Sequence, residues 1–468
     1  GNLTVAQQIT VSGTISDPKG QPVVGATVLV KGTTVGTVSG ADGTFSIPNV
    51  APDVTLSISF IGYTSQEIIV KGRTTIDVTL AISATGLDEI VVVGYSTQTK
   101  KTLSGAVSSV NNEALTRTKS PMVSNALVGK VAGVTARITD GRPGSSTTLM
   151  IRNFGTPLYI IDGIPKSEVD FNAMSMENIE SISILKDASA SIYGLLAANG
   201  VILVTTKMGK ISDKPIIKVD GYYGLQNFTR FPHPPDAYTY MLGQAESAQN
   251  QGQSTTITPA ILDSWKAGTY DPANGIDYRS FDYYEEVVGK NFPAPMGNLN
   301  VSASGATEKS SYFFSMGQLK QTAPIKGFYY KRSSMQTNLE ARLAKGLKIG
   351  TQISARIEAN RSAGLPGWDD YTNVFRSIIR MWPTERPYAN DNPNYLNNTH
   401  SININPGTYK ESVTGFGDIK NRVFNGNLYA EYDFGFGLKA KITGSYGYRD
   451  THNEFFEYTY NAFTYDRL

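Results

Sequence analysis

The second half of the chain, residues 216–468, alternates apolar and polar positions with a period of two residues. In Leu347–Glu358 the odd positions are apolar or small, and the even positions are mostly charged or polar. The same period recurs in Leu299–Ala303, Met335–Leu343, Phe424–Phe434 and Leu438–Tyr446. Such alternation is typical of β-strands with one apolar face. Segments of about ten residues indicate a transmembrane β-barrel, although a soluble antiparallel sandwich predicts the same alternation.

The first part of the chain, residues 9–81, places short strand-like runs between glycine-containing turns. These runs are Ile9–Ile15, Ala26–Val30, Thr44–Ile47 and Leu56–Phe60. Their even spacing predicts a small all-β sandwich.

Between these parts, residues 101–215 combine strands with one helix-prone segment, Ala188–Tyr193. The dipeptides Asp162-Gly163 and Asn199-Gly200 favour tight turns because both residue types tolerate positive φ. The β-branched runs beside them are Leu158–Ile161, Ile179–Leu185 and Val201–Thr206. This pattern predicts a small mixed α/β domain.

Composition narrows the class of protein. A length of 468 residues suggests two to four domains. The 42 basic and 40 acidic residues nearly cancel, so a nucleic-acid footprint is not expected. The absence of cysteine excludes disulfides and thiol chemistry. Residues 1–215 hold 8 aromatic residues and residues 216–468 hold 40, which marks a change of architecture near Lys210–Pro215.

Two segments resemble known domains. Residues 157–165 (PLYIIDGIP), 178–194 (NIESISILKDASASIYG) and 197–209 (AANGVILVTTKMG) together resemble the plug domain of SusC-like TonB-dependent outer-membrane transporters. Residues 11–17 (VSGTISD) and 42–47 (DGTFSI) resemble the carboxypeptidase-D regulatory-like domain that precedes many such plugs and carries no catalytic group.

The resemblance implies a mainly β chain of four segments. A carboxypeptidase-D regulatory-like β-sandwich covers residues 9–81, a linker with the TonB box covers 82–100, and an α/β plug covers 101–215. Residues 216–468 hold the first strands and extracellular loops of a 22-stranded antiparallel barrel. About eight candidate strands follow residue 215, and these are too few to close a barrel around a plug. We therefore expect either a longer chain, which we favour, or other chains that complete the barrel.

The joint between sandwich and plug contains an acidic pair, four β-branched residues and a glycine. An extended segment of this kind can add as a strand to the sheet edge of a partner. It resembles the TonB box, which implies contact with TonB through Asp88, Glu89, Ile90, Val91, Val92 and Val93. The alternative is an ordinary buried edge strand.

Two long interruptions, residues 232–290 and 361–420, are interpreted as extracellular loops. Aromatic side chains in the second could stack on sugar rings, although core packing explains aromatics as often. These candidate substrate contacts are Trp368, Tyr371, Trp382, Tyr388 and Tyr395. One departure from related plugs is that Arg152 leads almost at once into Pro157, so substrate contacts on that shortened loop are in doubt.

Little in the sequence indicates catalysis. The three histidines form no metal-binding spacing, and no P-loop or nucleophile motif occurs. Asn390–Asn394 offers oxygen ligands for calcium, but a solvated loop is the preferred interpretation. We expect no enzyme activity, no cofactor and no metal.

The resemblance implies a function in the bacterial outer membrane, with the N-terminal domain in the periplasm. That function is TonB-dependent import of oligosaccharides or peptides, together with a SusD-like surface lipoprotein and the TonB-ExbB-ExbD system. The alternative is an outer-membrane ligand-binding or signalling receptor that does not transport.

Overall fold

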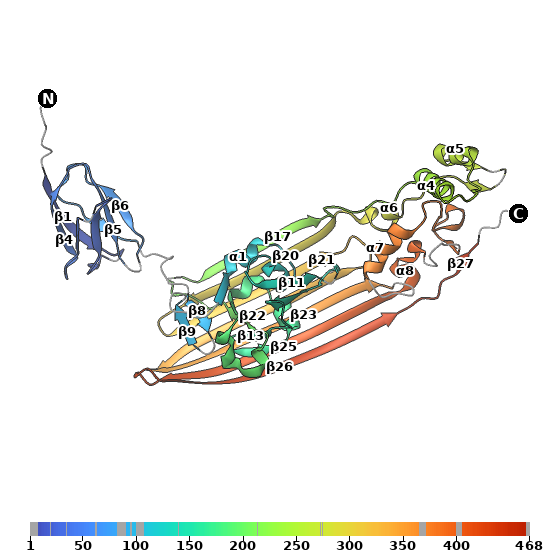
Figure 1. Ribbon diagram of the computed structural model, residues 1–468. Coiled ribbons are helices and arrows are strands. Elements are labelled where there is room, and N and C mark those ends of the chain that lie inside the picture. Colours follow the sequence, from blue (N-terminus) through green and yellow to red (C-terminus); the bar gives the residue numbers. More distant parts are fainter. Residues whose placement is uncertain are drawn as a thin grey trace, which may run out of the picture. The chain divides into compact units, whose positions relative to one another are not determined.

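The computed structural model describes most of the chain in two compact units (Figure 1). One unit is Gly1–Val92 with Ser96–Ser104, and the other is Val93–Tyr95 with Gly105–Leu468. The described residues are 8–18, 20–33, 35–60, 63–81, 90–93, 96–99, 107–138, 140–212, 214–271, 273, 275–364, 371–398 and 405–464.

The first unit contains two small sheets with a shared apolar core. Strand order is β4-β1-β7 in one sheet and β3-β2-β5-β6 in the other. In β4 the buried Phe45 and Ile47 alternate with exposed neighbours, so the apolar face of the strand points into the core. The bounds are β1 Ile9–Ser16, β2 Thr27–Val30, β3 Gly36–Val38, β4 Thr44–Val50, β5 Thr55–Ser59, β6 Gln66–Ile69 and β7 Val78–Thr79.

Next along the chain, β8 (Ile90–Val93) and β9 (Ser96–Thr99) form a two-stranded sheet. The backbone of Ile90–Val93 is therefore extended. Asp88 and Glu89 lie outside the described residues.

The plug is an α/β domain around a five-stranded mixed sheet of order β10-β15-β16-β13-β14, with a separate β11–β12 hairpin. Its strands are β10 Val107–Asn111, β11 Val134–Ile138, β12 Thr147–Ile151, β13 Leu158–Ile161, β14 Ile164–Lys166, β15 Ile179–Leu185 and β16 Val201–Thr206. Its helices are α1 Asn112–Arg117, α2 Val123–Leu127, α3 Glu168–Asn172 and the 3₁₀ segments η2 Met176–Asn178 and η3 Ala188–Ala197. The helix-prone segment thus forms a 3₁₀ helix.

The second half of the chain forms one long antiparallel sheet of seven strands, in the order β17-β20-β21-β22-β23-β25-β26. Its strands are β17 Ile216–Gln226, β20 Ala294–Ala306, β21 Ser310–Thr322, β22 Tyr329–Ala344, β23 Leu347–Ala363, β25 Phe416–Asp433 and β26 Lys439–Phe456. About eight strands are expected after residue 215, and seven strands form this sheet. The remaining strands of this half are two-residue pieces: β18 Tyr270–Asp271, β19 Ile276–Asp277, β24 Leu396–Asn397 and β27 Ala462–Phe463.

The two ends of the long sheet differ. Tight turns join strands at one end, as at Gly346, where φ is +84° between β22 and β23. Two long loops with helices lie at the other end, which we call the long-loop end (Figure 1). Their helices are α4 Ala237–Asn250, α5 Pro259–Ala267, α6 Tyr283–Val287, η4 Gly289–Asn291, α7 Tyr371–Arg380, η5 Ala389–Asp391, η6 Pro406–Thr408 and α8 Glu411–Thr414.

Among the described residues, no helix is both long and apolar enough to cross a membrane.

Candidate functional site

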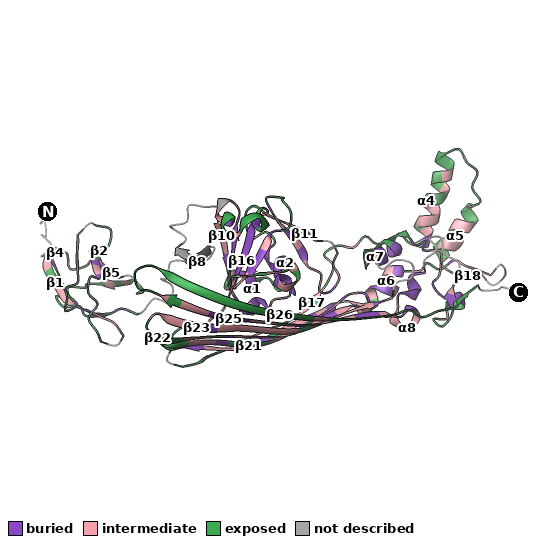
Figure 2. Cartoon of the chain, turned by 90° about the horizontal axis from the view of Figure 1, so that it is seen from below, coloured by how far each residue is buried: buried purple, intermediate pink, exposed green. Residues whose placement is uncertain are grey.

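The plug lies against one face of the long sheet (Figure 2), and polar side chains of that face bind it. Asn338, fully buried on β22, donates to Thr206 Oγ1 (2.8 Å) and to the carbonyl oxygen of Lys207 (2.7 Å). Ser315 donates to Asn178 Oδ1 at 2.6 Å. Buried polar groups need such partners because an unpaired one loses its hydration without compensation. Hydrogen bonds thus join the plug to the sheet, beside a small apolar cluster in which Met122 of the plug packs with Leu319 and Tyr330.

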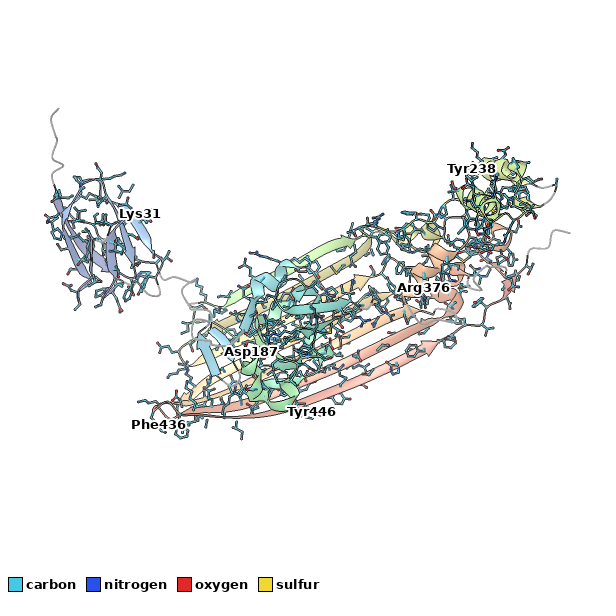
Figure 3. The ribbon with its side chains drawn as sticks, in the orientation of Figure 1. Lys31, Asp187, Tyr238, Arg376, Phe436 and Tyr446 are labelled. Carbon is cyan, nitrogen blue, oxygen red and sulfur yellow. The ribbon has the colours of Figure 1, made fainter. Side chains whose placement is uncertain are left out.

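The opposite, outward face of the sheet is apolar and exposed. Strand alternation places Val219, Met316 and Leu428 on it, with exposed fractions of 64%, 56% and 65%. Tyr446 on β26 shares this face, and Phe436 lies in the turn before that strand (Figure 3). A soluble sandwich would bury this face, so the ambiguity left by the periodicity is settled in favour of a barrel wall.

Asp170 is the central charged group between plug and sheet. Its carboxylate accepts hydrogen bonds from Arg356 Nη2 (2.6 Å), Arg449 Nη2 (2.7 Å) and Ser167 Oγ (2.8 Å). Burial alone would raise the pKa of Asp170, but Arg356, Ser167 and Arg449 favour the carboxylate and lower the pKa below its ordinary value. One plug carboxylate thus binds two sheet strands, β23 and β26.

A second polar contact lies beside it. Lys166, at the end of β14, donates to Asn425 Oδ1 of β25 at 2.7 Å. A cavity of about 70 Å³ separates plug from sheet here, and its lining includes Asp162, Gln336 and Gln352. A polar cavity of this size can hold water. The interface between plug and sheet therefore contains breakable polar contacts and internal space.

At the long-loop end, a cavity of about 300 Å³ opens between the plug and the loops. Its lining comes from the plug loop that follows β11, the ends of β17 and β21 with the residues after them, Phe292 at the end of the first long loop, and helix α7. The lining residues include Asp140, Gly141, Gln226, Phe228, Phe292, Gln321, Tyr371 and Phe375. We call this space the upper cavity.

The plug loop in the upper cavity is held in a fixed conformation. Asp140 accepts hydrogen bonds from the backbone N–H (3.0 Å) and Nε (2.8 Å) of Arg142. The N–H of Gly144 donates to Gln321 Oε1 at 3.0 Å, which ties the loop to β21. Gly144 has φ of +74°, and a Cβ there would come within 2.5 Å of the Tyr330 ring. Only glycine therefore fits at position 144, where the plug loop lies against the long sheet.

Aromatic rings form one side of the upper cavity. Phe228 contacts Phe292 and Phe375, with centroids 5.0 and 5.6 Å apart, and Tyr371 contacts Phe375 at 5.3 Å. The Arg142 guanidinium lies 6.0 Å from the centroid of the Tyr371 ring. Burial raises the pKa of Tyr371, so its hydroxyl remains protonated at neutral pH. The cavity thus offers apolar ring faces beside side-chain amide groups and the ion pair between Asp140 and Arg142.

The predicted aromatic contacts do not gather at one place. Tyr371 lines the upper cavity. Trp382 lies against Tyr240 (5.8 Å between centroids), and Tyr395 lies against Phe463 (4.9 Å). Tyr388 is mostly buried and donates its hydroxyl to Glu286 Oε1 at 2.5 Å. Trp368 lies outside the described residues.

Two ion networks join the two long loops. Glu286 pairs with Lys290 (2.5 Å) and with Lys410 (3.3 Å). Burial opposes ionisation of Glu286, yet the two lysines and Tyr388 lower its pKa below the ordinary value. The loops therefore form one folded body at the long-loop end.

The second network includes the segment considered for calcium. Arg279 and Arg386 each bind Asp391, at 2.5 and 2.8 Å. The Asp391 carboxylate is therefore neutralised by two guanidinium groups, which weakens the case for a cation there. Within the described part of the chain, no group of three or more His, Cys, Asp or Glu side chains is arranged to hold a metal ion.

Sequence reasoning missed most of the upper cavity. Taken alone, the glycines and proline of Gly141–Gly144 predict only a turn, whereas in the structure this segment belongs to the plug loop that lines the upper cavity. The shortened loop after Arg152 is a tight turn, with Arg152 and Asn153 both at positive φ. The signal that could have located the cavity is the glycine-proline composition of Gly141–Gly144, which allows close approach to a wall.

Comparisons with known proteins agree with this architecture. Residues 99–201 match the family described as TonB-dependent Receptor Plug Domain, and residues 11–92 match the CarboxypepD_reg-like domain. The chain is 35% identical over 391 residues to TonB-dependent receptor P26 of Formosa agariphila, covering 81% of this chain and 37% of that protein. It is 29% identical over 442 residues to TonB-dependent receptor SusC of Bacteroides thetaiotaomicron, covering 88% of this chain and 39% of that protein.

Solved structures show the same fold. The RagAB peptide importer in its closed-closed state aligns with a TM-score of 0.60 and 26% identity, covering 75% of this chain and 42% of that chain. Its open-open state gives a TM-score of 0.64 and 24% identity, covering 78% and 43%. The chain spans about two fifths of the length of the curated relatives that it matches. With its plug, its sandwich and its apolar-outside sheet, the chain belongs to the SusC-like family of TonB-dependent receptors.

Proposed function

We propose that this chain forms part of a TonB-dependent importer of oligosaccharides or peptides in the bacterial outer membrane. The observation that carries this proposal is the opposite character of the two faces of the long sheet. An exposed apolar face suits lipid, and a polar face with a plug hydrogen-bonded to it suits a gated water-filled lumen. A SusD-like lipoprotein at the long-loop end and the TonB-ExbB-ExbD system are the proposed partners.

The polar interface between plug and sheet supports a mechanism without covalent chemistry. Contacts such as Arg356–Asp170 and Lys166–Asn425 can exchange protein partners for water when the plug moves. Separation of an apolar interface would instead expose apolar surface to water. Force on the plug would therefore shift a two-state equilibrium between a plugged and an open lumen.

The segment that we propose to receive this force is Asp88–Val93. The extended backbone of Ile90–Val93 is suited to pairing with a strand of TonB, because main-chain hydrogen bonds then supply the affinity. This assignment places residues 9–81 in the periplasm. It also places the long-loop end outside the cell.

The upper cavity is the proposed first contact for substrate. Ring faces of Phe228 and Tyr371 can pack on a sugar ring or an apolar side chain, while Gln226 and Gln321 supply amide groups for polar contacts. The RagAB peptide importer, a structural neighbour, supports the peptide class, whereas the oligosaccharide class rests on the family resemblance alone. Trp368, Trp382, Tyr388 and Tyr395 stay predictions as substrate contacts.

The test is uptake of labelled oligosaccharides and peptides by cells that carry the full-length protein. Val91→Pro removes a strand N–H donor, so we expect uptake to be abolished while ligand binding at the cell surface persists. Val91→Thr keeps the donor and a β-branched shape and is the matched control, with uptake retained.

Two outcomes contradict the proposal in different ways. Equal loss of binding and uptake in Val91→Pro would make the segment structural. Binding without any uptake by the unaltered protein would favour the alternative, a ligand-binding or signalling receptor.

A further inference from the structure

Two lysines lie directly opposite each other on the outward face of the long sheet. Lys320 of β21 pairs in register with Lys331 of β22, near the long-loop end. Their neighbours Leu319 and Arg332 are almost fully buried on the plug side, so the lysines point outward by strand alternation. Like charges placed directly opposite destabilise a sheet unless an anion compensates them.

Neither lysine has an ion-pair partner among the described residues, in contrast to two cations of β25, two strands away from β22. Arg422 pairs with Asp450 at 2.8 Å, and Lys420 pairs with Asp418 at 3.1 Å. Lys331 Nζ lies 4.5 Å from the centroid of the Tyr329 ring. The sequence around the lysine pair also lacks acidic residues, because no Asp or Glu occurs from Lys309 to Leu339. An exposed third lysine, Lys326, lies in the β21–β22 loop.

An apolar groove adjoins the lysine pair on the same outward face. Its volume is about 560 Å³, and its lining includes Gln318 and Ser333, each two residues from a lysine along its strand. Most other lining side chains are apolar: Val301, Met316, Met335, Ile357, Phe424 and Tyr448. The two lysines therefore lie at one end of a groove whose apolar lining suits a hydrocarbon chain.

We propose that Lys320, Lys331 and the groove form a binding site for a phosphorylated lipid of the outer leaflet. The phosphate would lie between the two ammonium groups, and an acyl chain would lie in the groove below. Clusters of basic residues at a membrane surface bind anionic headgroups in this way. The groove argues for lipid over a soluble anion, because free phosphate would leave the apolar lining exposed. The assignment rests on the membrane orientation given under Proposed function.

The test uses the full-length protein in detergent micelles, titrated with diphosphorylated lipid A and with the same lipid after its phosphates are removed. We expect Lys320→Gln with Lys331→Gln to weaken binding of the phosphorylated lipid by about 25-fold, which is roughly fivefold for each lysine. Binding of the dephosphorylated lipid should not respond to the double variant. Lys309→Gln with Lys345→Gln, in tight turns at the opposite end of the sheet, is the matched control and should stay within about twofold.

Three results would overturn the inference: an unchanged affinity in the double variant, an equal loss in the control, or equally tight binding of inorganic phosphate alone. Uptake measured on the same variants separates this inference from the proposed function. The lysine variant should transport normally, because neither lysine touches the plug. Unchanged lipid binding in the lysine variant together with normal uptake would refute only the lipid site, whereas absence of uptake by the unaltered protein would refute only the proposed function.

Discussion

The N-terminal sandwich and the long sheet have the same period-two alternation and bury opposite faces. In the sandwich, apolar side chains such as Ile47 and Ile58 are 1% and 0% exposed, because two sheets share them as a core. In the long sheet the apolar face is exposed, and the plug covers polar side chains such as Asn338. Alternation therefore indicates that a strand has two different faces. What covers each face decides which one is inside.

The strongest way to break this comparison is to place a charge on the buried apolar face of the sandwich. Ile58→Asp should destabilise residues 9–81 by at least about 4 kcal/mol, because the carboxylate finds no compensating partner in the core. Limited proteolysis of the full chain at increasing temperature would detect the loss. Val38→Asp in β3, at a position 61% exposed, is the control and should cost no more than about 0.5 kcal/mol. Similar losses for both would show that Ile58 does not lie in a core.

A charge on the apolar face of the long sheet should act only in lipid. Leu428→Arg is expected to cost about 2–4 kcal/mol of unfolding free energy in phospholipid vesicles, because the cation would enter hydrocarbon. Unfolding of the vesicle-inserted protein in denaturant measures the cost. Leu428→Phe keeps the position apolar and serves as the control. A negligible cost for Leu428→Arg in vesicles would mean that this face does not meet lipid.

The charged contact between plug and sheet predicts a pH dependence. The pKa of Asp170 is lowered in the folded protein, so its ion pairs stabilise the plug above the ordinary value of 3.8. That contribution should disappear as pH falls through the lowered pKa. Hydrogen exchange of plug amides between about pH 5 and 2 should show this loosening.

Asp170→Asn removes the charge and should destabilise the plug contact by about 1–3 kcal/mol at neutral pH. The variant should also show a smaller increase in hydrogen exchange of plug amides between about pH 5 and 2. An acid response equal to that of the unaltered protein would assign the titration to another group.

The smallest effect is expected for an exposed ion pair of the sandwich. Lys31 lies at the surface of the first unit (Figure 3) and pairs with Glu67 at 2.7 Å, with both side chains more than half exposed. Water screens such a pair, so Lys31→Ala should change stability by less than about 0.5 kcal/mol in thermal unfolding. A loss as large as that of Asp170→Asn would contradict the distinction between surface and interface pairs.

Much of the fold could be predicted from local pattern. The turn at Gly346 and the strands on either side of it follow from glycine and period-two alternation, and the structure has them there. The upper cavity could not be predicted in the same way. Asp140, Gln226 and Phe375 lie far apart in sequence and meet only because the plug, the sheet and the loops fold together.

The sequence by itself determined the strands, the turns, the mixed plug and the family, because these depend on neighbouring residues and on local motifs. The tertiary structure alone decided which face of the long sheet is covered, which carboxylate holds the plug and which lysines face each other. Those features depend on strand register and on contacts between distant segments, such as Lys320 with Lys331 and Asp170 with Arg449. Periodicity cannot predict these features, because it describes each strand separately. It does not say which strand lies beside it, or whether a face meets water, lipid or protein.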